Sequence, residues 1–513
     1  MNRAYWLPRL ISFATGFLSL SQELAWMRFV AFLQKGTPYA FSAVLAIYLF
    51  GIAGGAWIGK RYCDRPVSAL AAVCGTILLI SGMFDLAAPW LFAEALGFGK
   101  ILGYAAGAAL IAISSALKSA VFPIVHHMGS QTQHGLVGQS VSTVYFANII
   151  GSTAGPLITG LFLFDVLTLQ QVFLAVGLST IAVAWAVLYS NSAATAAVSG
   201  IAAASMAVAS ALIAIVPRHE LIARMVRVTQ VEPAPIRMII ENRHGTIHTV
   251  EDPGGKDWVY GGNVYDGRVN TDLLHDVNGV WRAYLMAALH PHPKRVMILG
   301  LSAGSWARVI LGSRSVERVE AVEIDPGYLE IIRRYPEVAG LLDDPRLTVH
   351  IDDGRRWLRR HPDQKFDIIV ANTTFHWRSY ATLLLSQEFL QMARAHLAPG
   401  GLMAWNSTVS GDVFKTAQAV FPYVYKVQAY ALASNEPVVV DQAAAIERVK
   451  AMQFGGASAI AVDDPRFVLA ATRRLNELQP FADGLAWESR PLEIITDQNM
   501  ISEFKYGSIR IRR

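Results

Sequence analysis

The chain has 513 residues, of which 53% are hydrophobic and 16% are charged, and its mean hydropathy is +0.35. This composition excludes a disordered or fibrous protein and is too apolar for an ordinary soluble protein of this size. Residues 1–216 hold only 14 of the 83 charged side chains, with nine basic and five acidic residues among them. The positive charge therefore belongs to membrane flanks, and nucleic-acid binding has no support.

The first region contains apolar runs long enough to cross a bilayer, which takes about 20 residues each. Glu23 and Arg28 lie in the first run, which is too long and too charged for a cleaved signal peptide. The sequence predicts a transmembrane helical domain over 1–216 with about seven spans, drawn at 7–33, 39–59, 67–93, 101–127, 137–163, 168–190 and 195–216.

Basic residues near the first two spans predict the orientation of a multi-pass protein in a bacterial-type inner membrane. Arg3, Arg9 and the basic connection 60–65 place the N-terminus and that connection in the cytoplasm by the positive-inside rule. Seven spans would leave residues 217–513 outside, whereas the chemistry predicted below needs a cytosolic nucleotide. We expect this soluble region to be cytoplasmic and one run to be re-entrant or miscounted.

The second region divides into three predicted parts. Residues 217–282 form a linker and a small antiparallel β region, with strands at 237–241, 246–250 and 258–260. Residues 283–440 alternate strands and helices, which predicts a doubly wound parallel sheet. Residues 441–513 form a C-terminal helical extension and tail. The predicted strands of the sheet are 295–299, 319–324, 347–351 and 366–371.

Ligands bind such sheets at the carboxyl ends of the strands. The first strand runs into Gly300-Leu-Ser302-Ala-Gly304, a turn of small residues that allows a nucleotide to approach the backbone. The same residues match Gly-x-Ser-x-Gly, the nucleophile turn of α/β-hydrolases. A hydrolase also needs a later acid and histidine, for which His376 or His396 could serve.

The next strand ends favour an adenosyl cofactor over a hydrolase. Glu323, about 20 residues after the glycine turn, is placed to accept from both ribose hydroxyls, and Asp325 follows it. Asp353 and Gly354 follow the third strand, where a carboxylate can accept from the adenine amino group. The competing interpretation is that these carboxylates only cap helices.

These residues resemble the spermidine synthase (polyamine aminopropyltransferase) family, especially members with an N-terminal multi-span region. The resemblance covers about 236–440 and implies a class I methyltransferase-like, Rossmann-like fold that binds decarboxylated S-adenosylmethionine. Carried over by position, Asn270 replaces a glutamine near the nucleoside. The resemblance depends on 265–270, the Gly300 turn, Glu323 to Pro326, Asp353-Gly354, 385–389, 397–401 and the tail from Ile495.

The amine half of the resemblance is altered. The family's acidic residue in the glycine turn falls on Ala303, its Tyr-His pair on Gly279 and Val280, and its second loop acid on Phe375. Its catalytic aspartate falls on Asn372, and an amide cannot accept the amine proton. Either another group is the base, with His376, Tyr380, Asp276 and Asp352 as candidates, or the reaction needs no diamine.

We therefore expect a spermidine synthase-like transferase that uses decarboxylated S-adenosylmethionine or S-adenosylmethionine, with no metal, and releases 5′-methylthioadenosine. Alternatives are an intramolecular cyclase or lyase on the same cofactor, an S-adenosylmethionine-dependent methyltransferase, and a non-catalytic nucleoside sensor coupled to the membrane domain. The expected partners are a small-molecule substrate, either an amine or a membrane-delivered compound, the lipid bilayer and a second copy in a homodimer.

Overall fold

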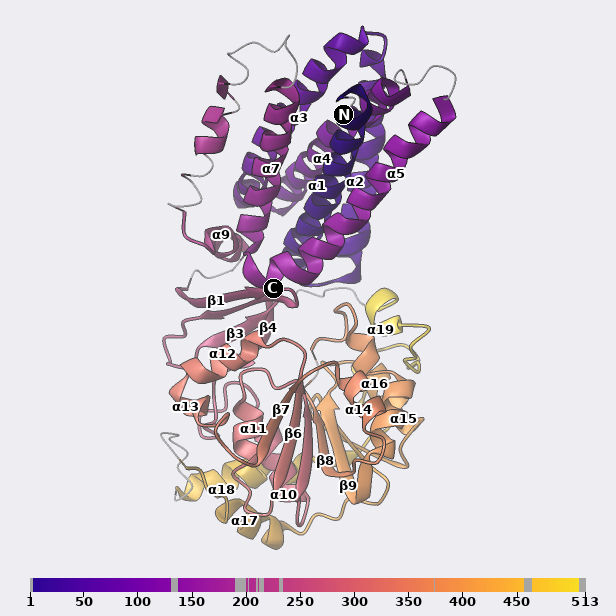
Figure 1. Ribbon diagram of the computed structural model, residues 1–513. Helices are drawn as coiled ribbons and strands as arrows, with labels where there is room; N and C mark the ends of the chain where they lie inside the picture. The colour runs from indigo at the N-terminus through magenta and orange to yellow at the C-terminus, as the bar shows by residue number, and fades with distance from the viewer. Residues whose placement is uncertain are drawn as a thin grey trace. The chain divides into compact units, whose positions relative to one another are not determined.

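The computed structural model describes residues 3–130, 137–189, 200–201, 203–208, 211, 216–229, 234–372, 374–455 and 464–506. The chain forms two compact units (Figure 1). The helical unit comprises residues 1–35, 39–234 and 239–246, and the α/β unit comprises 36–38, 235–238 and 247–513.

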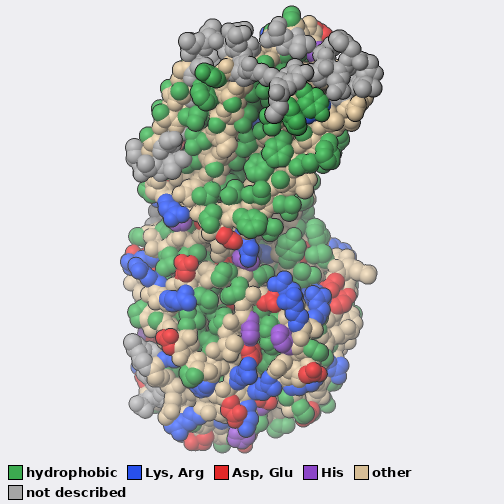
Figure 2. Space-filling view, viewed as in Figure 1, with side chains coloured by type: hydrophobic (Ala, Val, Ile, Leu, Met, Phe, Trp, Pro, Cys, Tyr) green, Lys and Arg blue, Asp and Glu red, His purple; other side chains and the backbone are tan. Residues whose placement is uncertain are grey.

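The helical unit is a bundle of long apolar helices. Five segments, 38–62, 69–98, 100–130, 141–166 and 169–189, are long and apolar enough to cross a membrane. Large side chains such as Phe50, Phe98 and Ile101 lie exposed on the bundle, and Figure 2 shows a largely hydrophobic face over these helices. The described helices are α1 (Arg3–Leu33), α2 (Pro38–Gly59), α3 (Val67–Ala95), α4 (Lys100–Ser130), α5 (Val137–Ile158), α6 (Phe164–Val166), α7 (Leu169–Tyr189) and α9 (Glu220–Thr229), with the short turns η1 (Lys60–Tyr62), η2 (Leu96–Phe98) and η3 (Thr159–Leu163).

These five segments correspond to five of the seven predicted spans. The first predicted span, 7–33, lies within α1, which is 31 residues long but is not among the five segments. The seventh, 195–216, lies largely outside the described residues. The count of seven spans and the side of the membrane remain predictions.

The bundle encloses a buried ion pair. Lys118 on α4 and Asp85 on α3 are 2% and 0% exposed, and their side chains form a salt bridge. Gln22 on α1 donates to Asp85 at 2.6 Å and accepts from Lys118 at 2.5 Å, and Ser114 donates to Asp85 at 2.6 Å. Charge is costly at membrane depth, so this closed network stabilises the bundle only while both partners are present.

A four-stranded sheet precedes the nucleotide-binding fold. Its order is β1 (Ile236–Asn242), β2 (Gly245–Val250), β3 (Trp258–Gly261) and β4 (Val264–Arg268). β3 pairs antiparallel with β2 and with β4. The sequence prediction missed β4 because its Asp266 and Gly267 are residue types depleted in strands.

The α/β unit is built on an eight-stranded sheet of order β12-β10-β11-β9-β8-β5-β6-β7. Five strands are parallel, β9 (Leu397–Asn406), β8 (Phe366–Ala371), β5 (Arg295–Leu299), β6 (Arg318–Glu323) and β7 (Leu347–Ile351). The four predicted strands are all parallel, as expected. The prediction did not include the antiparallel edge, which consists of β11 (Tyr430–Ser434), β10 (Tyr423–Val427) and β12 (Gln479–Pro480).

Two groups of helices cover this sheet (Figure 1). One group packs α10 with α11, α17 and α18, and the other packs α14 with α15 and α16. Central strands such as β5 and β8 are mostly apolar, which suits strands that are buried on both faces of the sheet. The helices are α10 (Trp281–Leu289), α11 (Ser305–Ile310), α12 (Gly327–Arg334), α13 (Pro336–Ala339), α14 (Gly354–Arg360), α15 (Gln387–Ala395), α16 (Gly411–Gln418), α17 (Gln442–Lys450), α18 (Pro465–Thr472) and α19 (Ile501–Phe504), with the 3₁₀ turns η4 (Ala381–Leu384), η5 (Arg473–Glu477) and η6 (Asp483–Leu485).

Candidate functional site

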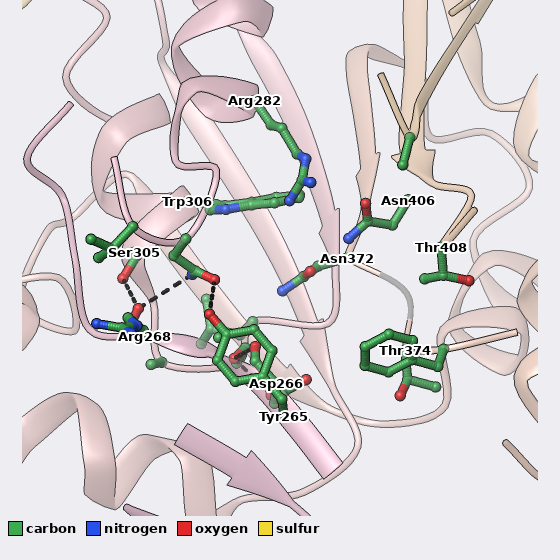
Figure 3. Close-up of a pocket in the computed structure, with 18 residues that line it drawn as sticks. Tyr265, Asp266, Arg268, Arg282, Ser305, Trp306, Asn372, Thr374, Asn406 and Thr408 are labelled. Atoms are coloured by element: carbon green, nitrogen blue, oxygen red, sulfur yellow. Dashed lines mark hydrogen bonds between the residues drawn. The ribbon is translucent and has the colours of Figure 1, made fainter. Parts of the chain in front are cut away.

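A cavity of about 330 Å³ opens at the carboxyl ends of β5 and β8. Because the chain continues from β5 to β6 on one side and returns to β8 on the other, this is the point where the strand order reverses. Figure 3 shows polar and aromatic side chains pointing into the cavity. It is lined by Tyr265, Asp266, Gly267, Arg268, Val277, Asn278, Arg282, Leu301, Ser302, Ala303, Ser305, Trp306, Asn372, Thr374, Phe375, Asn406, Thr408 and Ala429.

The turn after β5 requires glycine at its first position. Gly300 has a φ of +86°, and a Cβ there would lie 2.9 Å from the backbone oxygen of Asn372. Ser302 also has a positive φ, +48°, and donates to Asp266 Oδ2 at 2.8 Å. Gly304 has a φ of +79° and precedes α11. Two of the predicted cofactor residues thus shape the turn, and the third, Ser302, lines the cavity.

Glu323 holds this turn from the next strand. Its Oε2 accepts from the backbone amides of Leu301 and Ser302 at 2.8 and 3.1 Å, and its Oε1 accepts from the amide of Asp325 at 2.9 Å. Burial raises the pKa of Glu323 to about 7, while the amides of Asp325 and Ser302 act in the opposite direction. The carboxylate therefore holds the Gly300 turn in place, and its contacts are those of a structural cap.

The other predicted acids begin helices. Asp325 accepts from the amide of Gly327 at 2.9 Å, and Asp353 accepts from the amide of Arg356 at 2.8 Å as the N-cap of α14. This cap explains why α14 begins at Gly354. Asp352 forms salt bridges with Arg356 and Arg360 outside the cavity lining.

Asn270 is fully buried and organises its own loop. Its side chain accepts from the amide of Asp272 at 3.0 Å and donates to the carbonyls of Asp272 and His275 at 3.1 and 3.0 Å. Its backbone amide donates to Ser305 Oγ at 3.2 Å. Asn270 therefore reaches the cavity only through Ser305, which lines it.

The predicted catalytic residues do not all lie at the cavity. Asn372 lines the cavity directly. His376 does not, but its ring Nδ1 lies 2.8 Å from Oγ1 of Thr408, which does line it. Burial lowers the pKa of His376, so its ring is neutral at pH 7. Tyr380 is 74% exposed and, like Asp276, lies outside the lining.

The substituted positions of the amine half converge on the cavity. Ala303, Asn372 and Phe375 come from the turn after β5 and the loop after β8, and all three line it. Gly279 and Val280 immediately follow the lining residues Val277 and Asn278. The positions at which the resemblance predicts replaced residues, although distant in the sequence, therefore lie in or next to the lining of one cavity.

Asp266, Arg282 and Asn406 are among the polar lining residues that the sequence prediction missed. Asp266, at the end of the small sheet, accepts hydrogen bonds from Ser302 and Tyr328, and burial raises its pKa. Arg282 begins α10 and lies among aromatic rings. Asn406 ends β9, so the strand-end argument could have found it if that strand had been followed to its end.

No group of three His, Cys, Asp or Glu side chains within the part of the chain that the structure describes is placed to hold a metal ion. The polar groups that surround the cavity are mainly amides, hydroxyls and two guanidinium groups. These are donors suited to an organic ligand.

Comparison with known proteins matches residues 283–436 to the spermine/spermidine synthase domain. A polyamine aminopropyltransferase from Agathobacter rectalis is 34% identical over 119 residues, which cover 23% of this chain and 41% of that protein. One from Mycobacterium tuberculosis is 27% identical over 404 residues, covering 75% of this chain and 74% of that protein. A solved spermidine synthase in complex with the transition state analogue AdoDATO aligns at a TM-score of 0.38 and 19% identity, covering 47% of this chain and 88% of that one.

The chain spans less than half the length of the first of these relatives. The match covers β5 to β11 and the loops after β5 and β8 that line the cavity. These strands carry the Gly300 turn, Glu323 and Asp353, on which the resemblance was based. The spermine/spermidine synthase match thus covers residues 283–436 of a chain that begins with an apolar helical unit.

Proposed function

We propose that this protein is a membrane-bound transferase that binds decarboxylated S-adenosylmethionine or S-adenosylmethionine and transfers an alkyl group from its sulfonium to a small acceptor. The observation that carries the proposal is the cavity at the reversal point of the sheet, in contact with the turn that Glu323 holds. The polyamine aminopropyltransferases to which the chain is similar support this class of reaction.

The nucleoside would lie on the Glu323 side of the cavity. In this proposal Glu323, at the end of β6, would accept from ribose hydroxyls, and Asp353, after β7, from the adenine amino group. Gly300 and Gly304 allow the turn beside them to take positive φ values. The sulfonium alkyl chain would then extend into the cavity towards Asn372.

The reaction forms one bond and breaks one. A neutral acceptor nitrogen attacks the alkyl carbon next to sulfur, the carbon–sulfur bond breaks, and its electron pair returns to sulfur. The products are the alkylated acceptor and 5′-methylthioadenosine, and the acceptor nitrogen loses a proton. Asn372 cannot take that proton, whereas neutral His376 can receive it through the hydroxyl of Thr408.

Mass spectrometry of nucleoside products tests the proposal. The purified full-length protein is incubated with S-adenosylmethionine and with its decarboxylated form, each with and without putrescine. We expect 5′-methylthioadenosine that depends on an added acceptor. Its formation without an acceptor would indicate cyclisation or lysis, for which the relatives give no support, and S-adenosylhomocysteine would indicate methyl transfer. Binding without any product would favour a nucleoside sensor and contradict the proposal.

We propose that the α/β unit is cytoplasmic, because adenosyl cofactors are cytosolic compounds. Protease treatment of inside-out and right-side-out vesicles tests this location. Cleavage within residues 247–513 only in inside-out vesicles is expected, and cleavage only in right-side-out vesicles would contradict it.

A further inference from the structure

One cation in the cavity lacks an acidic partner. Arg282 lies in α10 with its guanidinium carbon 5.4, 5.9 and 5.8 Å from the ring centres of Trp281, Trp306 and Tyr430. Figure 3 shows its side chain beside Trp306, with Asn372 and Asn406 facing the same space. Aromatic rings thus fix the position of the guanidinium without neutralising its charge.

The nearby carboxylates are engaged elsewhere. Among the described residues Arg282 has no salt bridge, and its Nε is buried without a hydrogen-bond partner. Asp276 acts on it only at longer range and accepts from the amide of Val280 at 2.7 Å. Asp266, the acid of the cavity lining, accepts from Ser302 and Tyr328 and faces Arg378.

The second arginine of the cavity lining, Arg268, differs from Arg282 because it is paired with an acid. Arg268 forms a salt bridge of 3.0 Å with Asp252. Arg282 forms no such salt bridge with any described residue, so its guanidinium lines the cavity without a directly paired acid. A buried or half-buried charge without a partner is costly unless a ligand supplies the opposite charge.

The positions at which the family's acids are replaced also favour a negatively charged ligand. Acids that would attract a second ammonium group are replaced at Ala303, Asn372 and Phe375, and these residues share the cavity with Arg282. A diamine would bring two positive charges towards this guanidinium. A carboxylate would instead accept its parallel N–H donors.

We propose that the alkyl chain bound next to Arg282 carries a carboxylate. This inference rests on the proposed transferase function and specifies its substrate class. The carboxylate has two possible sources. It belongs either to the methionyl group of intact S-adenosylmethionine or to an amino acid acceptor. In both cases Arg282 is the residue that selects against the decarboxylated or diamine counterpart.

Matched ligand pairs separate the two sources. In the first arm, calorimetry measures binding of S-adenosylmethionine and of its decarboxylated form to the full-length protein. In the second arm, release of 5′-methylthioadenosine from the decarboxylated form is compared with 4-aminobutanoate and with putrescine as acceptors of equal chain length. A preference for the carboxylate ligand of roughly tenfold to a hundredfold is expected in one arm.

Arg282→Gln is expected to abolish that preference, and Arg282→Lys to retain part of it. Binding of 5′-methylthioadenosine, which has no alkyl carboxylate, controls for folding and should change less than about twofold in both variants. The exposed Arg314 gives a surface control, Arg314→Gln, that should behave as the wild type.

The outcomes distinguish this inference from the proposed function. Nucleoside binding or turnover with no carboxylate preference in either arm overturns the inference alone, as does a preference that survives in Arg282→Gln. Absence of any nucleoside binding overturns the proposed function and the inference together.

Discussion

A buried ion pair in the helical unit contrasts with a cation at the cavity of the α/β unit. Lys118 and Asp85 neutralise each other, and neighbouring amide and hydroxyl groups complete their hydrogen bonds. Arg282 lines the cavity, and within the described part of the chain it forms no salt bridge and its Nε has no hydrogen-bond partner. A closed network of charges contributes to the integrity of the fold, whereas charges left facing a cavity are available for a ligand.

This contrast gives opposite expectations for substitutions in the two units. Removing one member of the closed pair should lower the free energy of unfolding and leave nucleoside affinity per folded molecule unchanged. Removing groups around the cavity should lower affinity more than stability.

The largest effect is expected from Lys118→Met. It leaves Asp85 buried and without its cation, which should cost about 3–5 kcal/mol in the free energy of unfolding. Thermal unfolding of the detergent-solubilised protein measures the change. The double variant Lys118→Met with Asp85→Asn removes both charges and should recover most of the loss, and a single variant as stable as the wild type would show that the pair is not closed as described.

Gly300→Ala should have the next largest effect and lower the free energy of unfolding by roughly 2–4 kcal/mol. The cost arises because alanine disfavours the left-handed backbone and because the new side chain would displace the turn. The new Cβ would lie 2.9 Å from the backbone oxygen of Asn372, so nucleoside binding should be lost as well. Gly400→Ala is the matched control, because Gly400 has a φ of +72° but nothing within 4 Å of its Cβ position. Chemical unfolding and calorimetric binding should separate the two variants, and equal behaviour would contradict the crowding argument.

Glu323→Gln should weaken nucleoside binding by about 1–3 kcal/mol, the value of a charge-assisted hydrogen bond. The control is Glu320→Gln on the same strand, a buried acid that instead pairs with Arg318 and His350. The control should cost stability without changing the dissociation constant. An unchanged dissociation constant in Glu323→Gln would remove Glu323 from the ribose site.

The smallest expected effect is on pH dependence. Burial holds the pKa of Glu323 at about 7, above its ordinary value of 4.5, so the free protein carries a protonated carboxyl below that pH. A ribose that donates hydrogen bonds binds the ionised form, and affinity should therefore rise as pH increases through 7. Between pH 6 and pH 8 we expect a gain of about tenfold, with proton release visible by calorimetry in two buffers. The gain should be absent from Glu323→Gln, and its persistence there would assign it to another group.

Local patterns in the sequence were sufficient for most of the α/β elements. The strands ending at Leu299, Glu323, Ile351 and Ala371 were predicted because strands and helices alternate along this part of the sequence. The strand β4 and the antiparallel edge were missed. Both depend on pairing with distant segments, and β4 contains residues that propensity places in turns.

The Gly300 turn could be identified from spacing and residue type, and the substituted amine positions from the family resemblance. Asn372 remained central once the fold was known, because strand-end residues of neighbouring parallel strands meet at one edge. The sequence alone did not decide among His376, Tyr380 and Asp352 as candidate bases, because spacing along a loop does not determine which side chain reaches the cavity. The structure separates them, with only His376 in contact with a lining residue.

The sequence by itself determined that an apolar helical region precedes a region of alternating strands and helices, because composition and periodicity are local properties. The family resemblance added the prediction that the acids of the amine half are replaced. Only the tertiary structure placed Arg282 and Asp266 in the cavity and closed Lys118 against Asp85. The groups that surround these residues come from distant parts of the chain. Only the packed structure therefore shows which charges are paired within the protein and which face the cavity, where a ligand could bind.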